Sequence, residues 1–219
     1  MAFKTILFDL DGTLTDPKVG ITTCCQYGLR AVGVDVPDLK ELEQFIGPPL
    51  ISAFQEVYGI TEDQARMALE KYRERFTDIG IYENELLPGV PQMLEALKAA
   101  GKVVATASSK PEPFVKRILE HFSIDRYFDE IAGSTMDEKH AGKAEVVADV
   151  LRRLHIPEEE KDSVIMVGDR KHDVEGAAAH GIRTIAVTFG YGSVEELTTV
   201  GAWKIARSME ELTALLLEA

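Results

Sequence analysis

"ILFDLDGTLTD", residues 6–16, places two acids at the end of an apolar run. The run at 6–8 predicts a buried strand. Side chains two residues apart on an extended chain point the same way, so Asp9 and Asp11 can face one pocket. Two carboxylates that close must either gain a proton or gain a cation, and a hard divalent ion such as Mg²⁺ prefers these oxygen ligands. A simple turn formed by Asp and Gly is the alternative, but it accounts for one acid better than for two.

Working outward from this stretch, short apolar segments alternate with helical patterns. The expected strands are Thr5–Phe8, Val103–Ala107, Glu130–Ala132, Val164–Val167 and Thr184–Val187. The expected helices are Val90–Ala100, Glu112–Phe122, Lys143–Leu154 and Val174–His180. Apolar strands that alternate with helices predict an α/β fold with a parallel sheet covered on both faces. Ligands of such sheets bind beyond the carboxyl ends of the strands.

Residues 18–84 interrupt this alternation, because they contain helical patterns and no convincing strand. The expected helices are Thr22–Val32, Leu39–Phe45, Leu50–Tyr58 and Thr61–Phe76. The last of them starts with Thr61 and Gln64, which is typical of a capping box. The sequence therefore predicts an all-helical insert between the first strand and the rest of the sheet.

Composition limits the possible functions. With 219 residues, 45% of them hydrophobic, the chain suits one large domain or a core with a smaller insert. The net charge of −13 argues against broad binding of nucleic acid or anionic membranes, but it does not exclude a small anionic substrate. Cys24 and Cys25 are adjacent and fit neither a zinc site nor a disulfide framework, so we expect two small apolar residues on a helix. The chain shows no signal-peptide pattern and no apolar run of transmembrane length, so we expect a cytoplasmic protein. We also expect a monomer, because the sequence has no long apolar stripe beyond what the core needs.

Further polar clusters follow two of the other expected strands. Ser108 could bind a phosphate oxygen, or Ser109 could simply cap a helix that begins near Pro111. "GDRKHD" at 168–173 contains Asp169 and Asp173. They could cap a helix, or they could join Asp9 and Asp11 in an acidic cluster that binds one hard cation.

Lys143 stands at the expected start of a helix. It is either a solvated surface charge or the partner of an anion, because a cation at a helix N-terminus is otherwise unfavourable. Lys139 and His140 compete for any such role. The sequence contains no P-loop, no dinucleotide-binding glycine motif and no G-x-S-x-G elbow, which argues against three other classes of α/β enzyme.

"FDLDGTLTD", "SSK", Lys143 and "GDRKHD", in this order, resemble the four motifs of the haloacid dehalogenase superfamily. The helical insert resembles the cap of its phosphoglycolate phosphatase-like and 5′-nucleotidase-like members. The resemblance implies a Rossmann-like catalytic core at 1–17 and 85–219 and an α-helical cap domain at 18–84. It also implies a Mg²⁺-dependent phosphatase for a small phosphomonoester, related to phosphoglycolate, a nucleotide or a sugar phosphate.

The resemblance assigns roles to the four acids. Asp9 matches the nucleophile that forms an aspartyl-phosphate, and Asp11 matches the general acid and base. Mg²⁺ would be held by Asp9, the main-chain carbonyl of Asp11 and Asp169. Asp173 would support the water shell of the metal or the lysine. An acid at position 11 favours phosphoryl transfer to water over halide displacement.

The resemblance also assigns roles around the phosphoryl group. Ser108 and Lys143 would bind its oxygens and offset charge in the transition state, assisted by the main-chain N–H groups of Leu10 and Ser109. The remaining motif residues are Gly12 and Thr13, which turn the chain toward the insert.

Two stretches concern specificity. Gly47, Pro48 and Pro49 form a stiff bend that either lines the leaving-group pocket or only connects two helices. "TFGYGSVEEL", residues 188–197, is expected to close one side of the site, with Tyr191 as a packing or turn residue. Two alternative functions stay open: a phosphomutase of the β-phosphoglucomutase type, and a non-catalytic regulator that binds phosphate or metal.

Overall fold

The computed structural model describes residues 3–137 and 141–218. These residues form two compact units: residues 16–85, and the remaining described residues. Each unit is described separately below. Their predicted roles as cap domain and catalytic core stay predictions.

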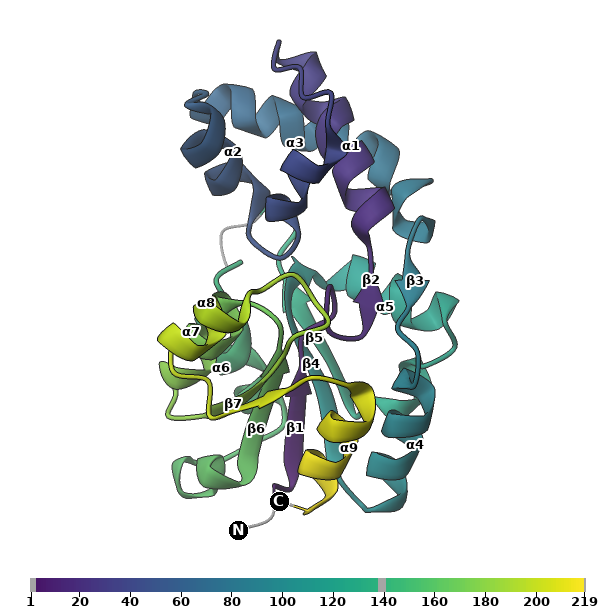
Figure 1. Cartoon of the computed structure of the whole chain (residues 1–219), viewed down its shortest axis with the longest axis vertical. Helices are drawn as coiled ribbons and strands as arrows, with labels where there is room; N and C mark the ends of the chain where they lie inside the picture. Colours follow the sequence, from purple (N-terminus) through teal and green to yellow (C-terminus); the bar gives the residue numbers. More distant parts are fainter. Residues whose placement is uncertain (1–2, 138–140, 219) are drawn as a thin grey trace. The chain divides into compact units, whose positions relative to one another are not determined.

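The larger unit is built on one parallel six-stranded sheet with the order β5-β4-β1-β6-β7-β8 (Figure 1). The strands are β1 Thr5–Phe8, β4 Val103–Pro111, β5 Glu130–Ser134, β6 Val164–Gly168, β7 Arg183–Val187 and β8 Lys204–Ala206. β1 lies between β4 and β6, with Leu7 in register with Ala105 and Met166. The predicted α/β fold with a parallel sheet is confirmed. All five expected strands are present, and β8 was not predicted.

Helices cover both faces of this sheet. They are α4 Val90–Ala99, α5 Glu112–His121, α6 Lys143–Arg153, α7 Lys171–Ala178, α8 Val194–Thr199 and α9 Met209–Glu218, with 3₁₀ turns at Asp125–Tyr127 and Glu158–Ser163. α6 packs beside α7, and α4 packs beside α9 (Figure 1). The helix expected at Val174–His180 begins three residues earlier, because the Asp173 carboxylate accepts the N–H of Arg170 at 3.0 Å and so caps the first turn.

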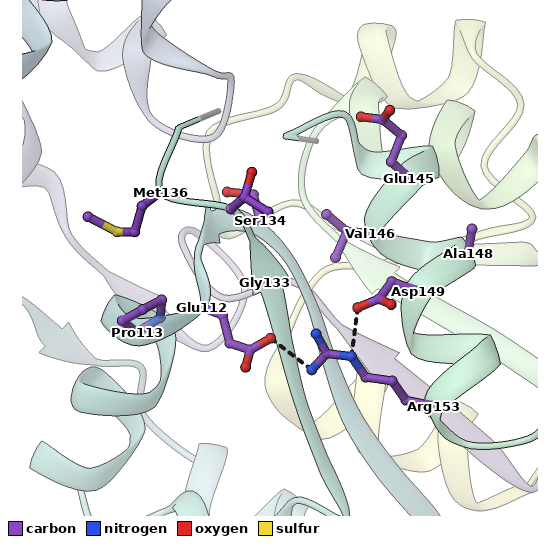
Figure 2. Close-up of a pocket in the computed structure, with 11 residues that line it drawn as sticks. Glu112, Pro113, Gly133, Ser134, Met136, Glu145, Val146, Ala148, Asp149 and Arg153 are labelled. Carbon is purple, nitrogen blue, oxygen red and sulfur yellow. Dashed lines mark ion pairs between the residues drawn. The ribbon is translucent and has the colours of Figure 1, made fainter. Parts of the chain in front are cut away.

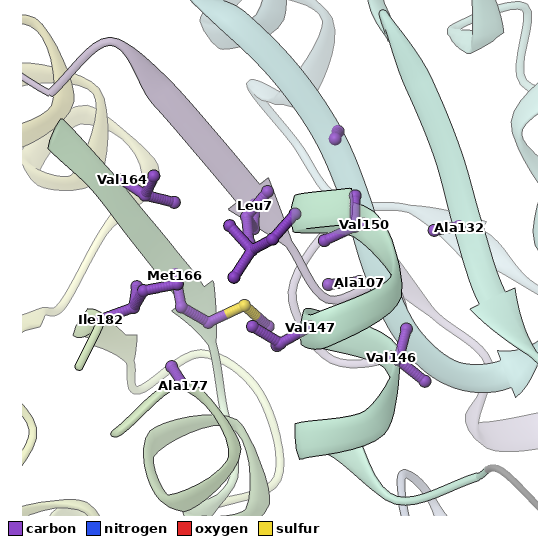
Figure 3. Packing of buried hydrophobic residues seen from close by; sticks show 12 residues of the cluster. Leu7, Ala107, Ala132, Val146, Val147, Val150, Val164, Met166, Ala177 and Ile182 are labelled. Carbon is purple, nitrogen blue, oxygen red and sulfur yellow. The ribbon is translucent and has the colours of Figure 1, made fainter. Parts of the chain in front are cut away.

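The core between the sheet and α6 fixes the direction of the strand ends. Leu7, Ala107 and Met166 are fully buried and share one apolar cluster with Val147 and Val150 of α6 (Figure 3). Burying a side chain such as Leu7 contributes roughly 1.5–3 kcal/mol. Alternate residues of a strand point to the same face. Because Leu7 packs against α6, the side chain two residues later, at position 9, also points toward α6.

The smaller unit is helical, as expected for residues 18–84. Its elements are α1 Lys18–Ala31, α2 Leu50–Tyr58, α3 Glu62–Phe76 and 3₁₀ helices at Leu39–Phe45 and Gly80–Tyr82. The capping box is confirmed: Thr61 Oγ1 accepts the N–H of Gln64 at 3.3 Å, and Gln64 Oε1 accepts the N–H of Thr61 at 3.0 Å. Cys24 and Cys25 are buried on α1 and form no disulfide, as expected from the sequence.

Two short strands, β2 Thr15–Asp16 and β3 Glu85–Leu86, pair where the chain passes from one unit to the other and back. Within the described residues, no helix has both the length and the apolar character needed to cross a membrane.

Candidate active site

Asp9 and Asp11 follow the end of β1 and are both buried, at 4% and 5% exposure. The N–H of Asp9 donates to the carbonyl of Val167 at 2.9 Å, which continues the pairing of β1 with β6 beyond the strand end. The chain then turns back, with the N–H of Gly12 donating to the carbonyl of Thr15 at 2.8 Å. Sheet pairing therefore holds the two acids at the carboxyl edge of the sheet.

Three acids form one cluster at this edge. Asp9, Asp169 and Asp173 are buried, and each offers a carboxylate oxygen within 4.8 Å of the others. Burial, together with the charges of Asp173 and Asp9, raises the pKa of Asp169 well above its ordinary value. Burial raises the pKa of Asp173 to about 6, although Lys143 opposes this shift. The carboxylates therefore carry a free-energy cost that a cation would relieve.

Lys143 joins this cluster from the start of α6. Its Nζ lies 2.9 Å from Asp9 Oδ1 and 2.7 Å from Asp173 Oδ1, and it donates to the carbonyl of Ala107 at 2.9 Å. Burial lowers the pKa of Lys143, but the charges of Asp173 and Asp9 outweigh burial and raise it above its ordinary value. The alternative of a solvated surface lysine is wrong, since Lys143 is only 6% exposed. Lys139 and His140 lie outside the described residues.

Lys110 is a second site lysine, and we did not predict it. Its Nζ lies 2.9 Å from Asp11 Oδ2, and both side chains are only 6% exposed. Burial raises the pKa of Asp11, and Lys110 opposes that shift. β4 extends to Pro111 instead of ending at Ala107, and its pairing with β5 shifts register between Ser108 and Pro111. The sequence stretch "SSK" was the available signal, but this irregularity is not visible in it.

The two serines before Lys110 have different surroundings. Ser108 is buried beside the site, and its Oγ accepts the N–H of Lys110 at 3.3 Å. The alternative in which Ser109 caps the next helix is wrong, because Pro111 is the N-cap residue of α5 and the cap has no side-chain hydrogen bond. The carbonyl of Ser109 instead accepts the hydroxyl of Ser134 at 2.7 Å.

Asp169 is not a helix cap either, since Arg170 is the N-cap residue of α7 and its N–H donates to the Asp173 carboxylate. Asp169 Oδ1 accepts the hydroxyl of Thr13 at 3.5 Å, and Oδ2 accepts the main-chain N–H of Tyr191 at 2.7 Å. Tyr191 was expected as a packing or turn residue, but its main chain reaches the acidic cluster. The stretch 188–197 was expected beside the site, but a main-chain donor does not depend on residue type, so this particular contact could not be predicted.

Gly47, Pro48 and Pro49 belong to the smaller unit and connect its first 3₁₀ helix to α2, with Pro49 as the N-cap residue. Their predicted contribution to the leaving-group pocket stays a prediction.

A cavity of about 700 Å³ opens between α5, the end of β5 and α6 (Figure 2). Arg153 crosses it, 2.8 Å from Glu112 Oε2 and 2.6 Å from Asp149 Oδ2. None of the residues described as lining the cavity belongs to the acidic cluster. The pair with Glu112 therefore links α6 to α5, and neither pair includes a residue of the acidic cluster.

The donor set fits a hard divalent cation. Asp9, Asp169 and Asp173 offer only carboxylate oxygen, which is the ligand type that Mg²⁺ prefers. Lys110 and Lys143 balance two of the site's four described carboxylates, so a dication would balance the rest.

The chain is similar in sequence to three curated relatives. It is 44% identical over 197 residues to a 5′-nucleotidase of Pseudomonas aeruginosa, covering 90% of this chain and 88% of the relative. It is 39% identical over 193 residues to the tyrosine-protein kinase PtkA of Mycobacterium tuberculosis, covering 88% of this chain and 64% of PtkA. It is 30% identical over 218 residues to a phosphoglycolate phosphatase of Vibrio parahaemolyticus, covering 95% of this chain and 94% of the relative.

Comparison of the fold with solved structures also points to phosphatases. The crystal structure of a predicted phosphatase from Clostridium acetobutylicum superposes with a TM-score of 0.96 at 41% identity, and each chain is covered completely. The model of the haloacid dehalogenase-like hydrolase family matches residues 6–187. The chain therefore belongs to the haloacid dehalogenase-like hydrolase family and is a phosphoric monoester hydrolase of that family.

Proposed function

We propose that the protein is a Mg²⁺-dependent phosphatase that hydrolyses a small phosphomonoester through an aspartyl-phosphate on Asp9. The observation that carries the proposal is the buried network in which Lys143 joins Asp9 to Asp173, while Lys110 holds Asp11 beside them. The acids proposed as nucleophile and proton carrier therefore lie in ion pairs with two lysines, which supports these roles.

In the first step, a carboxylate oxygen of Asp9 attacks phosphorus and the bond from phosphorus to the leaving oxygen breaks. The leaving oxygen takes a proton from Asp11. The raised pKa of Asp11, caused by its burial, supports this role because it favours the protonated form.

In the second step, water attacks the aspartyl-phosphate and gives a proton to Asp11. The bond from phosphorus to Asp9 breaks, so orthophosphate leaves and both acids are regenerated. Ser108 and Lys143 would donate hydrogen bonds to the phosphoryl oxygens during both steps.

Mg²⁺ would be held by Asp9, Asp169 and the main-chain carbonyl of Asp11, and it would neutralise charge on the transferring group. Asp173 would hold Lys143 in place, which agrees with their separation of 2.7 Å.

The test is Asp9→Asn, assayed with p-nitrophenyl phosphate and Mg²⁺. We expect kcat to fall by a factor of about 10⁶, the scale seen when a hydrolase loses its nucleophile. Asp35→Asn is the control, because Asp35 is exposed and paired only with Arg30 among the described contacts. Brief incubation of the wild type with a ³²P-labelled phosphate ester, followed by acid quenching, should leave label on Asp9. Full activity in Asp9→Asn would rule out this nucleophile.

Two alternatives differ from a phosphatase in the acceptor of the phosphoryl group. A phosphomutase returns it to a sugar phosphate, and a tyrosine kinase, suggested by the similarity to PtkA, transfers it to tyrosine. Wild-type protein incubated with phosphoglycolate, nucleoside monophosphates, sugar phosphates and ATP should release orthophosphate. Isomerised sugar phosphate would indicate a mutase, and phosphotyrosine formed from ATP would indicate a kinase. Binding of phosphate or metal without turnover on the whole panel would support the non-catalytic regulator.

A further inference from the structure

The loop after β7, residues 188–193, contacts Asp169 from two sides. The N–H of Tyr191 donates to Asp169 Oδ2 at 2.7 Å, and Asp169 is completely buried. A Cβ added at Gly190 would collide with the Asp169 carboxylate and with the carbonyl of Gly12, and one added at Gly192 would collide with the Asp169 carbonyl. This approach is therefore possible only because both positions are glycine.

A second set of contacts ties α8 to the segment that carries Asp169. Glu196 Oε1 accepts the main-chain N–H of Lys171 at 2.8 Å and lies 3.3 Å from Arg170 Nε. Glu196 is in turn fixed at the start of α8, since its N–H donates to Ser193 Oγ at 3.0 Å. The two residues that follow Asp169 are thus anchored to the same loop and helix that contact its carboxylate.

We infer that residues 190–196 form a positioning clamp, which holds the Asp169 carboxylate in the orientation that binds the divalent cation. Glu196 is the positioning residue that a substitution can test, because the Tyr191 donor belongs to the main chain. The inference rests on the proposed metal site. It goes beyond that proposal because it assigns metal affinity to residues that do not contact the metal.

The clamp is needed because two neighbouring carboxylates repel the Asp169 carboxylate. Asp173 and Asp9 repel its charge, and a carboxylate free to rotate would turn away from them. Groups that orient a metal ligand typically change metal affinity by 10–100-fold when they are removed. The Tyr191 N–H occupies Oδ2 and the Thr13 hydroxyl lies 3.5 Å from Oδ1, so rotation of the carboxylate would break both contacts.

The test measures the Kd for Mg²⁺ alone by isothermal titration calorimetry on the full-length, metal-free protein. We expect Glu196→Ala to weaken binding by about tenfold. Glu196→Gln should stay within about threefold of the wild type, since its amide oxygen can still accept from Lys171. Glu195→Ala, an exposed neighbour on α8, is the matched control. Gly190→Ala should weaken binding at least as much as Glu196→Ala, because its Cβ displaces the carboxylate itself.

Two further measurements separate positioning from general damage. Thermal unfolding in EDTA should give the same Tm within a few degrees for Glu196→Ala and Glu196→Gln, and kcat of Glu196→Ala should recover at high Mg²⁺. Wild-type affinity in both Glu196→Ala and Gly190→Ala would overturn the clamp alone, provided that Asp169→Asn loses binding. Wild-type affinity in Asp169→Asn, or no Mg²⁺ binding by the wild type, would overturn the proposed metal site and the clamp with it.

Discussion

Lys110 and Asp11 form an ion pair from which water is almost excluded. Removing one partner of such a pair leaves the other charge buried and uncompensated, which typically costs about 3–5 kcal/mol. The second oxygen of Asp11, Oδ1, is buried and has no hydrogen-bond partner among the described residues. Asp11 therefore depends on Lys110 for its charge balance.

We expect Lys110→Met to lower the free energy of unfolding at pH 7.5 by about 3 kcal/mol. The double variant Lys110→Met, Asp11→Asn should recover most of that loss, and urea unfolding of both single variants and the double variant measures the coupling. Lys98→Met is the control, because Lys98 pairs with Asp129 at half-exposed positions and should cost less than about 1 kcal/mol. Additive effects of the two substitutions would contradict the coupling.

The acidic cluster should make the metal-free protein less stable as pH rises. The pKa of Asp in an unfolded chain is about 3.9, whereas burial raises the pKa of Asp173 to about 6 in the fold. Between these values the folded state binds more protons than the unfolded state, so the free energy of unfolding falls as pH rises and stays low above pH 6.

Asp169→Asn removes one of these buried charges. In EDTA at pH 7.5 it should raise Tm by about 2–4 °C, the shift that roughly 1 kcal/mol gives in a protein of this size. At pH 4.5 the difference should shrink, because the raised pKa of Asp169 favours the protonated, uncharged form of the wild-type group as pH falls. Thermal unfolding across this pH range measures the effect. If the curves of Tm against pH are parallel for the wild type and Asp169→Asn, ionisation of Asp169 does not lower the stability of the fold.

At the scale of elements, two effects oppose each other at Gly176 on α7: an alanine there would raise helix propensity, but its Cβ would disturb the packing. In a helix interior, Gly→Ala ordinarily stabilises by roughly 0.8–1 kcal/mol. Here a Cβ would collide with Cβ and Cγ of Lys143, whose Nζ binds Asp9 and Asp173. The glycine makes room for the lysine stem between α6 and α7.

We therefore expect Gly176→Ala to lower stability instead of raising it, and to lower kcat by about tenfold through displacement of the Lys143 ammonium. Glu175→Ala, exposed on the same helix, is the control. Urea unfolding and steady-state kinetics check the two effects. A Gly176→Ala variant that is more stable and fully active would show that α6 and α7 can separate freely.

The elements also show how far the sequence could predict this fold. β1 lies at its predicted residues because Ile6, Leu7 and Phe8 form a continuous buried run that an acid ends. β8, α8 and α9 were missed. β8 is a short edge strand that begins with an exposed lysine. The two helices do carry a start signal, since Ser193 and Ser208 each accept the N–H of the glutamate three residues later. The extension of β4 beyond Ala107 depends on a register shift against β5, which is a property of the pair of strands and not of either sequence.

For the site, the sequence indicated that the acids and the lysine at position 143 would lie together, but it indicated neither Lys110 nor the main-chain contacts. Asp9, Asp169, Asp173 and Lys143 come from three distant segments, and they meet because parallel strands bring their carboxyl ends to one edge. The Tyr191 amide could not be predicted, since every residue except proline carries that donor.

At the scale of the whole molecule, charge should make phosphate binding depend on the metal. The chain carries a net charge of −13, and the candidate active site has four described carboxylates against Lys110 and Lys143. A phosphate dianion therefore meets a negative site in a negative protein, and repulsion of this kind opposes association.

We expect inorganic phosphate to bind measurably only when Mg²⁺ is present, with Kd at least about tenfold weaker in EDTA. Calorimetric titration of phosphate with and without Mg²⁺ measures this, and raising the salt concentration separates the two sources of repulsion. Added salt screens the net charge of the molecule but acts less on buried groups. Salt should therefore strengthen metal-free binding only slightly. Equal affinity for phosphate with and without Mg²⁺ would mean that Lys110 and Lys143 suffice to hold the anion, and that the metal serves a later step.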